Sequence, residues 1–244
     1  KPELARLADA VHAEGALVSA QLGHAGLVAD AMSNKQKSLA PSRRFSPVAK
    51  GIVPPATAAD MARVRKDFAK AAAIAVEAGI DCLEVHVGHN YLLSSFLSPN
   101  LNKRKDSYGG SITNRSRFPR EVLQAVREAV GDRAAVIAKL NMTDGVPKGL
   151  QVPESLEVAK LMESDGALDA LQLTGGSSLL NGMYFFRGDV PLEEFVRTQP
   201  KAVAPVVRLF LKRIMPHYPH GGACCHAQAR RNTPRRERRP ERTE

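Results

Sequence analysis

No stretch of this sequence is suited to crossing a membrane. It contains no run of about 18 consecutive apolar residues, the length that a membrane-spanning helix requires. The first residues, Lys1-Pro-Glu-Leu-Ala-Arg6, lack the apolar core of a secretory signal peptide. We therefore expect no membrane partner and a cytoplasmic location.

Cysteine is scarce, with only Cys82, Cys224 and Cys225 in 244 residues. Three cysteines are few, and their number is odd, which argues against a disulfide framework. Cys82 lies in an apolar run, so we expect a small, buried side chain there. His220 and His226 flank the other two cysteines, but adjacent cysteines do not match the usual spacing of a zinc site.

Excess basic charge is nearly absent from most of the chain. The net charge is +10, yet residues 205–244 contain ten Lys or Arg and three Glu, which leaves +3 for residues 1–204. A nucleic-acid-binding protein would need a basic face on its folded body, so we expect no nucleic-acid partner. The arginine-rich end has no apolar periodicity, and its composition predicts disorder.

Strand-like and helix-like patterns alternate along the rest of the chain. Short runs rich in Val, Leu and Ile predict strands at residues 16–22, 81–87, 134–140 and 168–174. Apolar residues at helical spacing predict helices over residues 4–11, 61–75, 118–129 and 153–162. Thr57 and Asp60 resemble a capping box before the second helix. Strands that are apolar on both faces are typical of parallel sheets covered by helices.

A (β/α) barrel and a doubly wound sheet would both fit this alternation. The doubly wound nucleotide-binding fold should show a Gly-rich turn after its first strand, and none is present. Polar residues instead gather just after the strands, where barrels form their active sites. These residues are Gln21, His24, His86, His89, Lys139, Asn141 and Thr174. The pattern therefore favours the barrel.

His86, His89 and Tyr91 stand where the second predicted strand ends in a loop. Two hydrogen-bond donors beside a phenol can hold and protonate an electron-poor carbonyl substrate. A competing interpretation makes His24, His86 and His89 the three nitrogen ligands of a metal-dependent barrel hydrolase. No carboxylate with suitable spacing accompanies them, which disfavours that alternative.

Three segments resemble the Old Yellow Enzyme family of FMN-dependent NADH:flavin oxidoreductases and ene-reductases. Residues 16–26, Ala-Leu-Val-Ser-Ala-Gln-Leu-Gly-His-Ala-Gly, are similar to that family's third barrel strand. Residues 86–99, from His-Val-Gly-His-Asn-Tyr to Leu-Ser-Pro, are similar to its fourth strand and loop. Residues 102–115, Asn-Lys-Arg-Lys-Asp-Ser-Tyr-Gly-Gly-Ser-Ile-Thr-Asn-Arg, resemble the long signature that follows, which in the family is largely structural and shapes the rim.

The resemblance implies a role for each matching position. Gln21 would hydrogen-bond the flavin pyrimidine edge, and Lys139 stands where the family has an arginine near flavin N1 and O2. His86 and His89 would bind the substrate oxygen, with His86 also next to the cofactor, and Tyr91 would donate the proton. The implied activity is FMN-dependent reduction, with NADH or NADPH as hydride donor, of activated C=C bonds in α,β-unsaturated carbonyl compounds.

The resemblance covers about residues 1–205, which would form strands three to six of a (β/α)8 barrel. We expect residues 206–244 to be a disordered or out-of-frame tail, so that the chain is a fragment truncated at its N-terminus and altered at its C-terminus. The flavin phosphate loops of the family follow later strands. We therefore expect this chain alone to bind FMN poorly or not at all.

Overall fold

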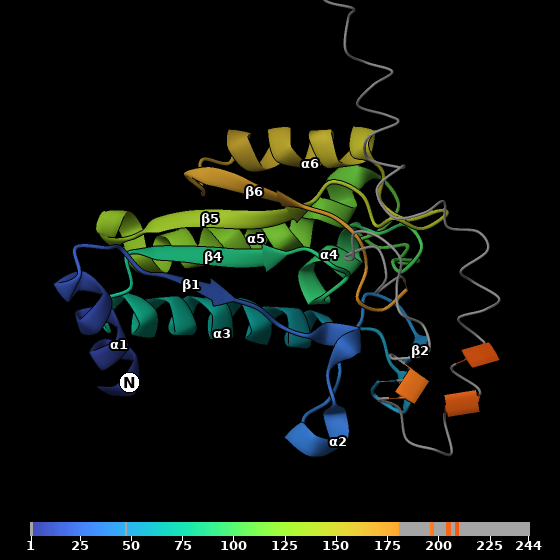
Figure 1. The fold of residues 1–244 in the computed structure, drawn as a ribbon. Helices are drawn as coiled ribbons and strands as arrows, with labels where there is room; N and C mark the ends of the chain where they lie inside the picture. The colour runs from blue at the N-terminus through green and yellow to red at the C-terminus, as the bar shows by residue number, and fades with distance from the viewer. Residues whose placement is uncertain (1, 47, 181–195, 198–203, 206–207, 210–244) are drawn as a thin grey trace, which may run out of the picture. The chain divides into compact units, whose positions relative to one another are not determined.

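The computed structural model describes residues 2–46, 48–180, 196–197, 204–205 and 208–209 (Figure 1). The chain divides into two units, Lys1–Gly182 and Met183–Glu244, and the first contains nearly all described residues. The predicted tail, residues 206–244, lies outside them apart from residues 208–209. The domain boundary near residue 205 therefore stays a prediction.

Four parallel strands form the sheet of the first unit, in the order β1-β4-β5-β6. The strands are β1 (Ser19–Leu22), β4 (Cys82–Val87), β5 (Ala135–Asn141) and β6 (Ala170–Thr174). All four predicted strands are confirmed, although each begins slightly later than predicted. The register places Gln21 beside Glu84, His86 beside Lys139, and Asn141 beside Thr174.

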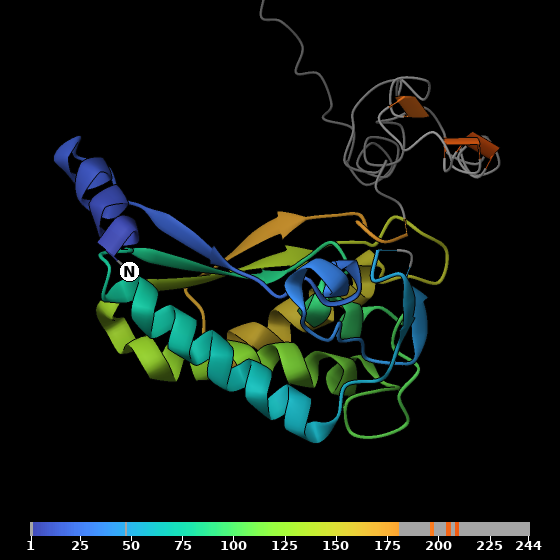
Figure 2. The same cartoon turned by 90° about the horizontal axis from the view of Figure 1, so that it is seen from below.

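Three long helices cover one face of this sheet (Figure 2). They are α3 (Ala58–Val76), α5 (Ile112–Val130) and α6 (Val152–Ser164). Val85, Val87 and Leu140 on the strands are fully buried and belong to the same apolar core as Phe118 and Val122 of α5. Because side chains alternate along a strand, Glu84, His86 and Lys139 point to the opposite face, which these three helices do not cover.

Shorter elements complete the unit. The helix α1 (Pro2–Ala13) precedes the sheet, and α4 (Leu92–Leu97) follows β4. Between β1 and α3 lie the 3-10 turn η1 (Gly26–Val28), α2 (Ala31–Asn34) and the antiparallel pair β2 (Arg44–Ser46) and β3 (Gly51–Val53), and η2 (Gly131–Arg133) follows α5. None of the helices in the part of the chain that the structure describes has both the length and the apolar character that spanning a bilayer demands.

The predicted capping box at the start of α3 is confirmed. The Thr57 hydroxyl accepts a hydrogen bond from the Asp60 amide at 3.1 Å, and the Asp60 carboxylate accepts one from the Thr57 amide at 3.0 Å. These reciprocal bonds satisfy backbone donors that an isolated helix start would leave without partners. Helix α3 therefore begins at the position that the local sequence predicts.

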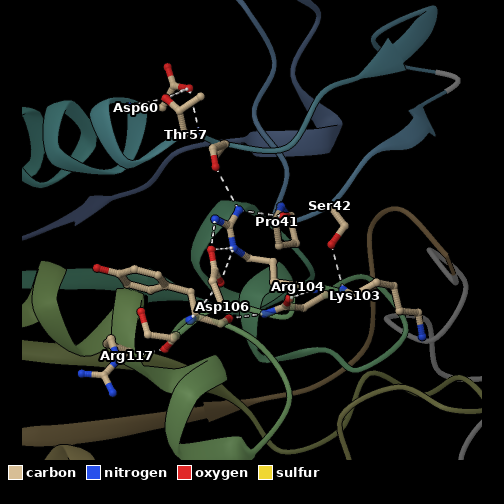
Figure 3. A network of polar contacts seen from close by, with 12 residues as sticks. Pro41, Ser42, Thr57, Asp60, Lys103, Arg104, Asp106 and Arg117 are labelled. Atoms are coloured by element: carbon tan, nitrogen blue, oxygen red, sulfur yellow. Dashed lines mark hydrogen bonds and ion pairs between the residues drawn. The ribbon is translucent and has the colours of Figure 1, made fainter.

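The signature segment 102–115 joins two loops at the rim of the sheet (Figure 3). The Arg104 guanidinium donates to the carbonyls of Pro41 at 3.0 Å and Ala56 at 2.9 Å, and it pairs with Asp106 at 2.6 Å. Beside it, the Lys103 amide donates to the Ser42 hydroxyl at 2.8 Å. One guanidinium thus ties the loops before β2 and after β3 to the loop after α4, a structural role that agrees with the expectation for this segment.

Candidate active site

The carboxyl end of β4 turns sharply, and this turn positions two imidazoles. His86 is in the strand, while His89 and Asn90 have φ angles of +60° and +58°. A non-glycine residue in this left-handed region costs about 1–2 kcal/mol, although Asn tolerates it better than most. Position 88, between the two histidines, requires glycine, because a Cβ there would lie 2.9 Å from Thr174 Cγ2 and 3.1 Å from His86 Cε1.

The turn brings His86, His89 and Tyr91 into one cluster. The His86 and His89 rings meet edge to face with centroids 5.0 Å apart, and the Tyr91 ring stacks on His86 at 4.7 Å. His86 is buried, and Tyr91 is half-buried at the start of α4. The structure therefore brings together the three side chains that the sequence predicts as substrate-binding and catalytic.

A chain of hydrogen bonds assigns the tautomers of the two neutral imidazoles. The Gly88 amide donates to His86 Nδ1 at 3.0 Å, so the His86 proton is on Nε2. His86 Nε2 lies 3.3 Å from His89 Nδ1 and donates to it, which places the His89 proton on Nε2. His89 Nε2 lies 2.8 Å from the Thr174 hydroxyl oxygen. Each ring therefore presents an Nε2–H donor, which is the group that a substrate oxygen needs.

Burial keeps both imidazoles uncharged at neutral pH. Desolvation, followed by the nearby His89 and Lys139, lowers the pKa of His86 to about 4. Desolvation and then Lys139 also lower the pKa of His89. The two rings consequently act as neutral hydrogen-bond donors rather than as imidazolium ions.

Gln21, Glu84 and Lys139 form a polar row on the face that the three long helices leave uncovered. Lys139 Nζ pairs with the Glu84 carboxylate at 2.8 Å, and the Gln21 amide donates to the same carboxylate oxygen. Lys139 thus has an acidic partner, Glu84, on the neighbouring strand. Glu84 was missed by the sequence analysis, although a charged residue inside an apolar strand was the available signal.

This row suits the polar edge of a flavin. The Lys139 ammonium has three donors and the Gln21 amide has two, so contact with Glu84 leaves each residue further hydrogen-bonding capacity. Both side chains stand on the same sheet face as His86. Gln21 and Lys139, the two residues predicted to contact the pyrimidine edge of FMN, therefore lie on one face with donors to spare, and their contact with the cofactor stays a prediction.

Asn141 and Asp144 form a second, fully buried layer behind the imidazoles. Asn141 Oδ1 accepts from the His89 amide at 3.0 Å, and Asn141 Nδ2 donates to Asp144 Oδ1 at 3.0 Å. The sequence predicted Asn141 as a strand-end polar residue of the site, but not Asp144 or Asn90. Nothing in their local pattern separates them from ordinary loop residues.

His24 has a separate local role. Its Nδ1 accepts from the Gly26 amide at 3.0 Å, and burial, followed by the charge of Arg63, lowers its pKa. Within the described residues, no group of three His, Cys, Asp or Glu side chains is placed to hold a metal ion. The alternative hydrolase site with His24, His86 and His89 therefore gains no support.

Cys82, expected to be buried, is only half-buried.

Comparison with known proteins identifies the family. A model of the NADH:flavin oxidoreductase / NADH oxidase family matches residues 2–173, and the chain belongs to this family. It is 62% identical over 218 residues to 4,4'-dithiodibutanoate disulfide reductase of Rhodococcus erythropolis, covering 89% of this chain and 54% of that relative. The chain thus spans about half the length of this curated relative.

Solved structures agree with this assignment. A 2-naphthoyl-CoA reductase in complex with 2-naphthoyl-CoA has a TM-score of 0.70 at 29% identity, covering 79% of this chain and 32% of that one. Old Yellow Enzyme from Pichia sp. AKU4542 has a TM-score of 0.52 at 36% identity, covering 56% of this chain and 39% of that one. The predicted family and the partial barrel are confirmed, as are FMN and a nicotinamide dinucleotide as the cofactors of this family.

Proposed function

We propose that this chain forms the substrate-binding and proton-donating part of a flavin-dependent reductase that acts on activated C=C bonds of α,β-unsaturated carbonyl compounds. The observation that carries the proposal is the convergence of His86, His89 and Tyr91 at the carboxyl end of β4. Active sites of barrel enzymes lie at this end of the strands.

Each of these side chains has a task in the proposed reaction. The Nε2–H groups of His86 and His89 donate to the carbonyl oxygen once it replaces His89 Nδ1 and Thr174 Oγ1 as acceptor. These bonds strengthen as negative charge develops on the oxygen. Bound FMN, reduced by NADH or NADPH, would supply a hydride to the β-carbon. The Tyr91 hydroxyl gives its proton to the α-carbon, so the C=C bond gains one hydride and one proton.

A second candidate substrate class is an organic disulfide. The 62% identity to a 4,4'-dithiodibutanoate disulfide reductase over 89% of this chain supports it. Two electrons cleave the S–S bond, and two protons convert both sulfur atoms to thiols. A thiolate takes its proton readily from water, so this reaction needs no acid at carbon. The two candidates therefore differ in how much they depend on Tyr91.

The decisive experiment compares the unaltered chain with Tyr91→Phe. Because this chain alone is expected to bind FMN weakly, the purified protein is first incubated with excess FMN and its flavin occupancy is measured. The loaded protein is then assayed with NADH or NADPH, separately on 2-cyclohexenone and on 4,4'-dithiodibutanoate. Loss of a positioned general acid typically costs about 10²–10⁴-fold, so Tyr91→Phe should lower enone reduction by that factor. Disulfide reduction should fall only a few-fold.

A substitution in α4, the helix that follows the turn, provides the control. Ser95→Ala removes a hydroxyl that donates to the Leu92 carbonyl within α4, and it should leave both rates nearly unchanged. Equal activity of Tyr91→Phe and the unaltered chain on the enone would refute the assigned acid. Turnover of the disulfide alone would replace the primary substrate class with the second, and no turnover of either substrate by protein that holds FMN would refute the proposal.

A further inference from the structure

We infer that Asp144 is a positioning residue of this site, which holds the left-handed turn at His89 and Asn90 so that the two imidazoles keep their mutual geometry. The inference deepens the proposed function and rests on it. Asp144 acts through two neighbours: Asn90, which lies in the turn, and Asn141, which accepts from the His89 amide.

The Asp144 carboxylate is the centre of a buried network. Its Oδ1 accepts from Asn90 Nδ2 and from Asn141 Nδ2, each at 3.0 Å, and its Oδ2 accepts from the Leu150 amide at 2.9 Å. Asp144, Asn90 and Asn141 are each 0% exposed. Bonds of this kind to a buried carboxylate are charge-assisted and stronger than those between neutral groups.

The network reaches the imidazole through the backbone. Asn141 Oδ1 accepts from the His89 amide at 3.0 Å, and the next residue, Asn90, is bonded to Asp144 through its side chain. Asn141 is itself oriented by Asp144 and by the Gly176 carbonyl at 2.9 Å. Both residues of the turn are therefore attached, directly or through one amide, to the same carboxylate.

The conformation of the turn requires such support. His89 and Asn90 are consecutive residues with φ near +60°, a conformation that non-glycine residues adopt at an energetic cost. Such strain persists only where the surroundings over-determine it, and it gathers at functional sites. Asn90 Oδ1 is buried without a hydrogen-bond partner among the residues that the structure describes, so its amide is oriented by the bond to Asp144 alone.

Histidine-selective ¹⁵N NMR of the purified chain tests the inference without flavin or substrate. It reports the tautomer and the titration of His86 and His89, which lie in an environment set by Glu84, Lys139 and Tyr91. In Asp144→Ala the turn should relax toward solvent. The pKa of His86 should then move upward by about one unit or more, because desolvation no longer opposes the charged ring.

The conservative variant separates positioning from stability. In Asp144→Asn, the amide oxygen can still accept from Asn90 and Asn141, and only the bond from the Leu150 amide is lost. Both Asp144 variants should therefore have lower urea midpoints, whereas only Asp144→Ala should move the histidine signals. Asp169→Ala is the matched control, since this carboxylate holds the Val136 amide at 2.7 Å at the opposite end of β5.

A pair of substitutions at Asn90 covers the case in which Asp144→Ala fails to fold. Asn90→Ala and Asn90→Gly both lose the bond to Asp144, but only glycine takes φ of +58° without strain. Histidine signals should move in Asn90→Ala and stay in place in Asn90→Gly. Unchanged signals in both Asp144→Ala and Asn90→Ala would overturn the inference, as would an equal movement in the Asp169→Ala control. Failure of the reductase assay alone would leave the NMR result standing.

Discussion

At the residue scale, His86 links the stability of the fold to pH. Folding lowers its pKa from an ordinary value of 6.5 to about 4. Between pH 4 and pH 6.5, His86 is therefore protonated in the unfolded chain and neutral in the folded chain. The free energy of unfolding should therefore decrease as pH falls from 6.5 towards 4, by up to ~3 kcal/mol. Urea titrations at several pH values measure this slope.

A variant without the imidazole identifies the source of the slope. His86→Asn should flatten the pH dependence across this window. A remainder should persist, since burial also lowers the pKa of His24 and His89. The lowered pKa values of Asp60 and Asp169 act only at more acidic pH. An unchanged slope in His86→Asn would show that the imidazole is not desolvated in the folded protein.

At the scale of one element, the start of α3 depends on its capping box. Thr57→Ala removes the hydroxyl that accepts from the Asp60 amide, and it should lower the free energy of unfolding by about 1 kcal/mol. The Thr57 backbone and hydroxyl lower the pKa of Asp60, so loss of the hydroxyl should also raise that pKa towards its ordinary value. Chemical denaturation and carboxyl-selective NMR measure the two effects.

Thr113 serves as the comparison for this prediction. It is an exposed threonine in the first turn of α5, where Ser111 rather than Thr113 is the capping residue. Thr113→Ala should change stability by less than about 0.5 kcal/mol. Equal effects at the two threonines would contradict a special role for the cap.

At the scale of the whole first unit, one buried guanidinium joins three helices. Arg115 in α5 donates to the carbonyl of Leu97 at the end of α4, and it pairs with Glu154 in α6. Its side chain is only 4% exposed, whereas that of Glu154 is 32% exposed. Arg115→Met leaves a buried carbonyl without its donor and should cost about 3 kcal/mol, measured by urea denaturation.

Arg117 on the same helix provides the contrast. It is exposed and donates to the Ser107 carbonyl at 2.9 Å. Arg117→Met should therefore cost less than about 0.5 kcal/mol. If Arg115→Met were equally mild, the three helices would be held together by apolar packing alone.

Local patterns predicted the four parallel strands and the four longer helices of this fold, but not α2, α4 or the β2–β3 pair. The alternation of apolar runs and helical periodicity located β4 and α3, and Thr57 with Asp60 located the start of α3. Each of these features depends on residues that are close in the chain, such as a hydroxyl and an amide three positions apart. The same holds for His86, His89 and Tyr91, which one tight turn brings together.

Contacts between distant residues were beyond that reasoning. Asp144 follows His89 by more than 50 positions, yet its carboxylate supports the turn through Asn90 and Asn141. Glu84 meets Lys139 only because β4 and β5 pair in a particular register. The order of residues by itself determined the four longer helices, the four parallel strands, the family and the three side chains proposed to act on substrate. Only the tertiary structure decided which buried groups hold those side chains in place, because hydrogen bonds between distant segments leave no periodic mark on the sequence.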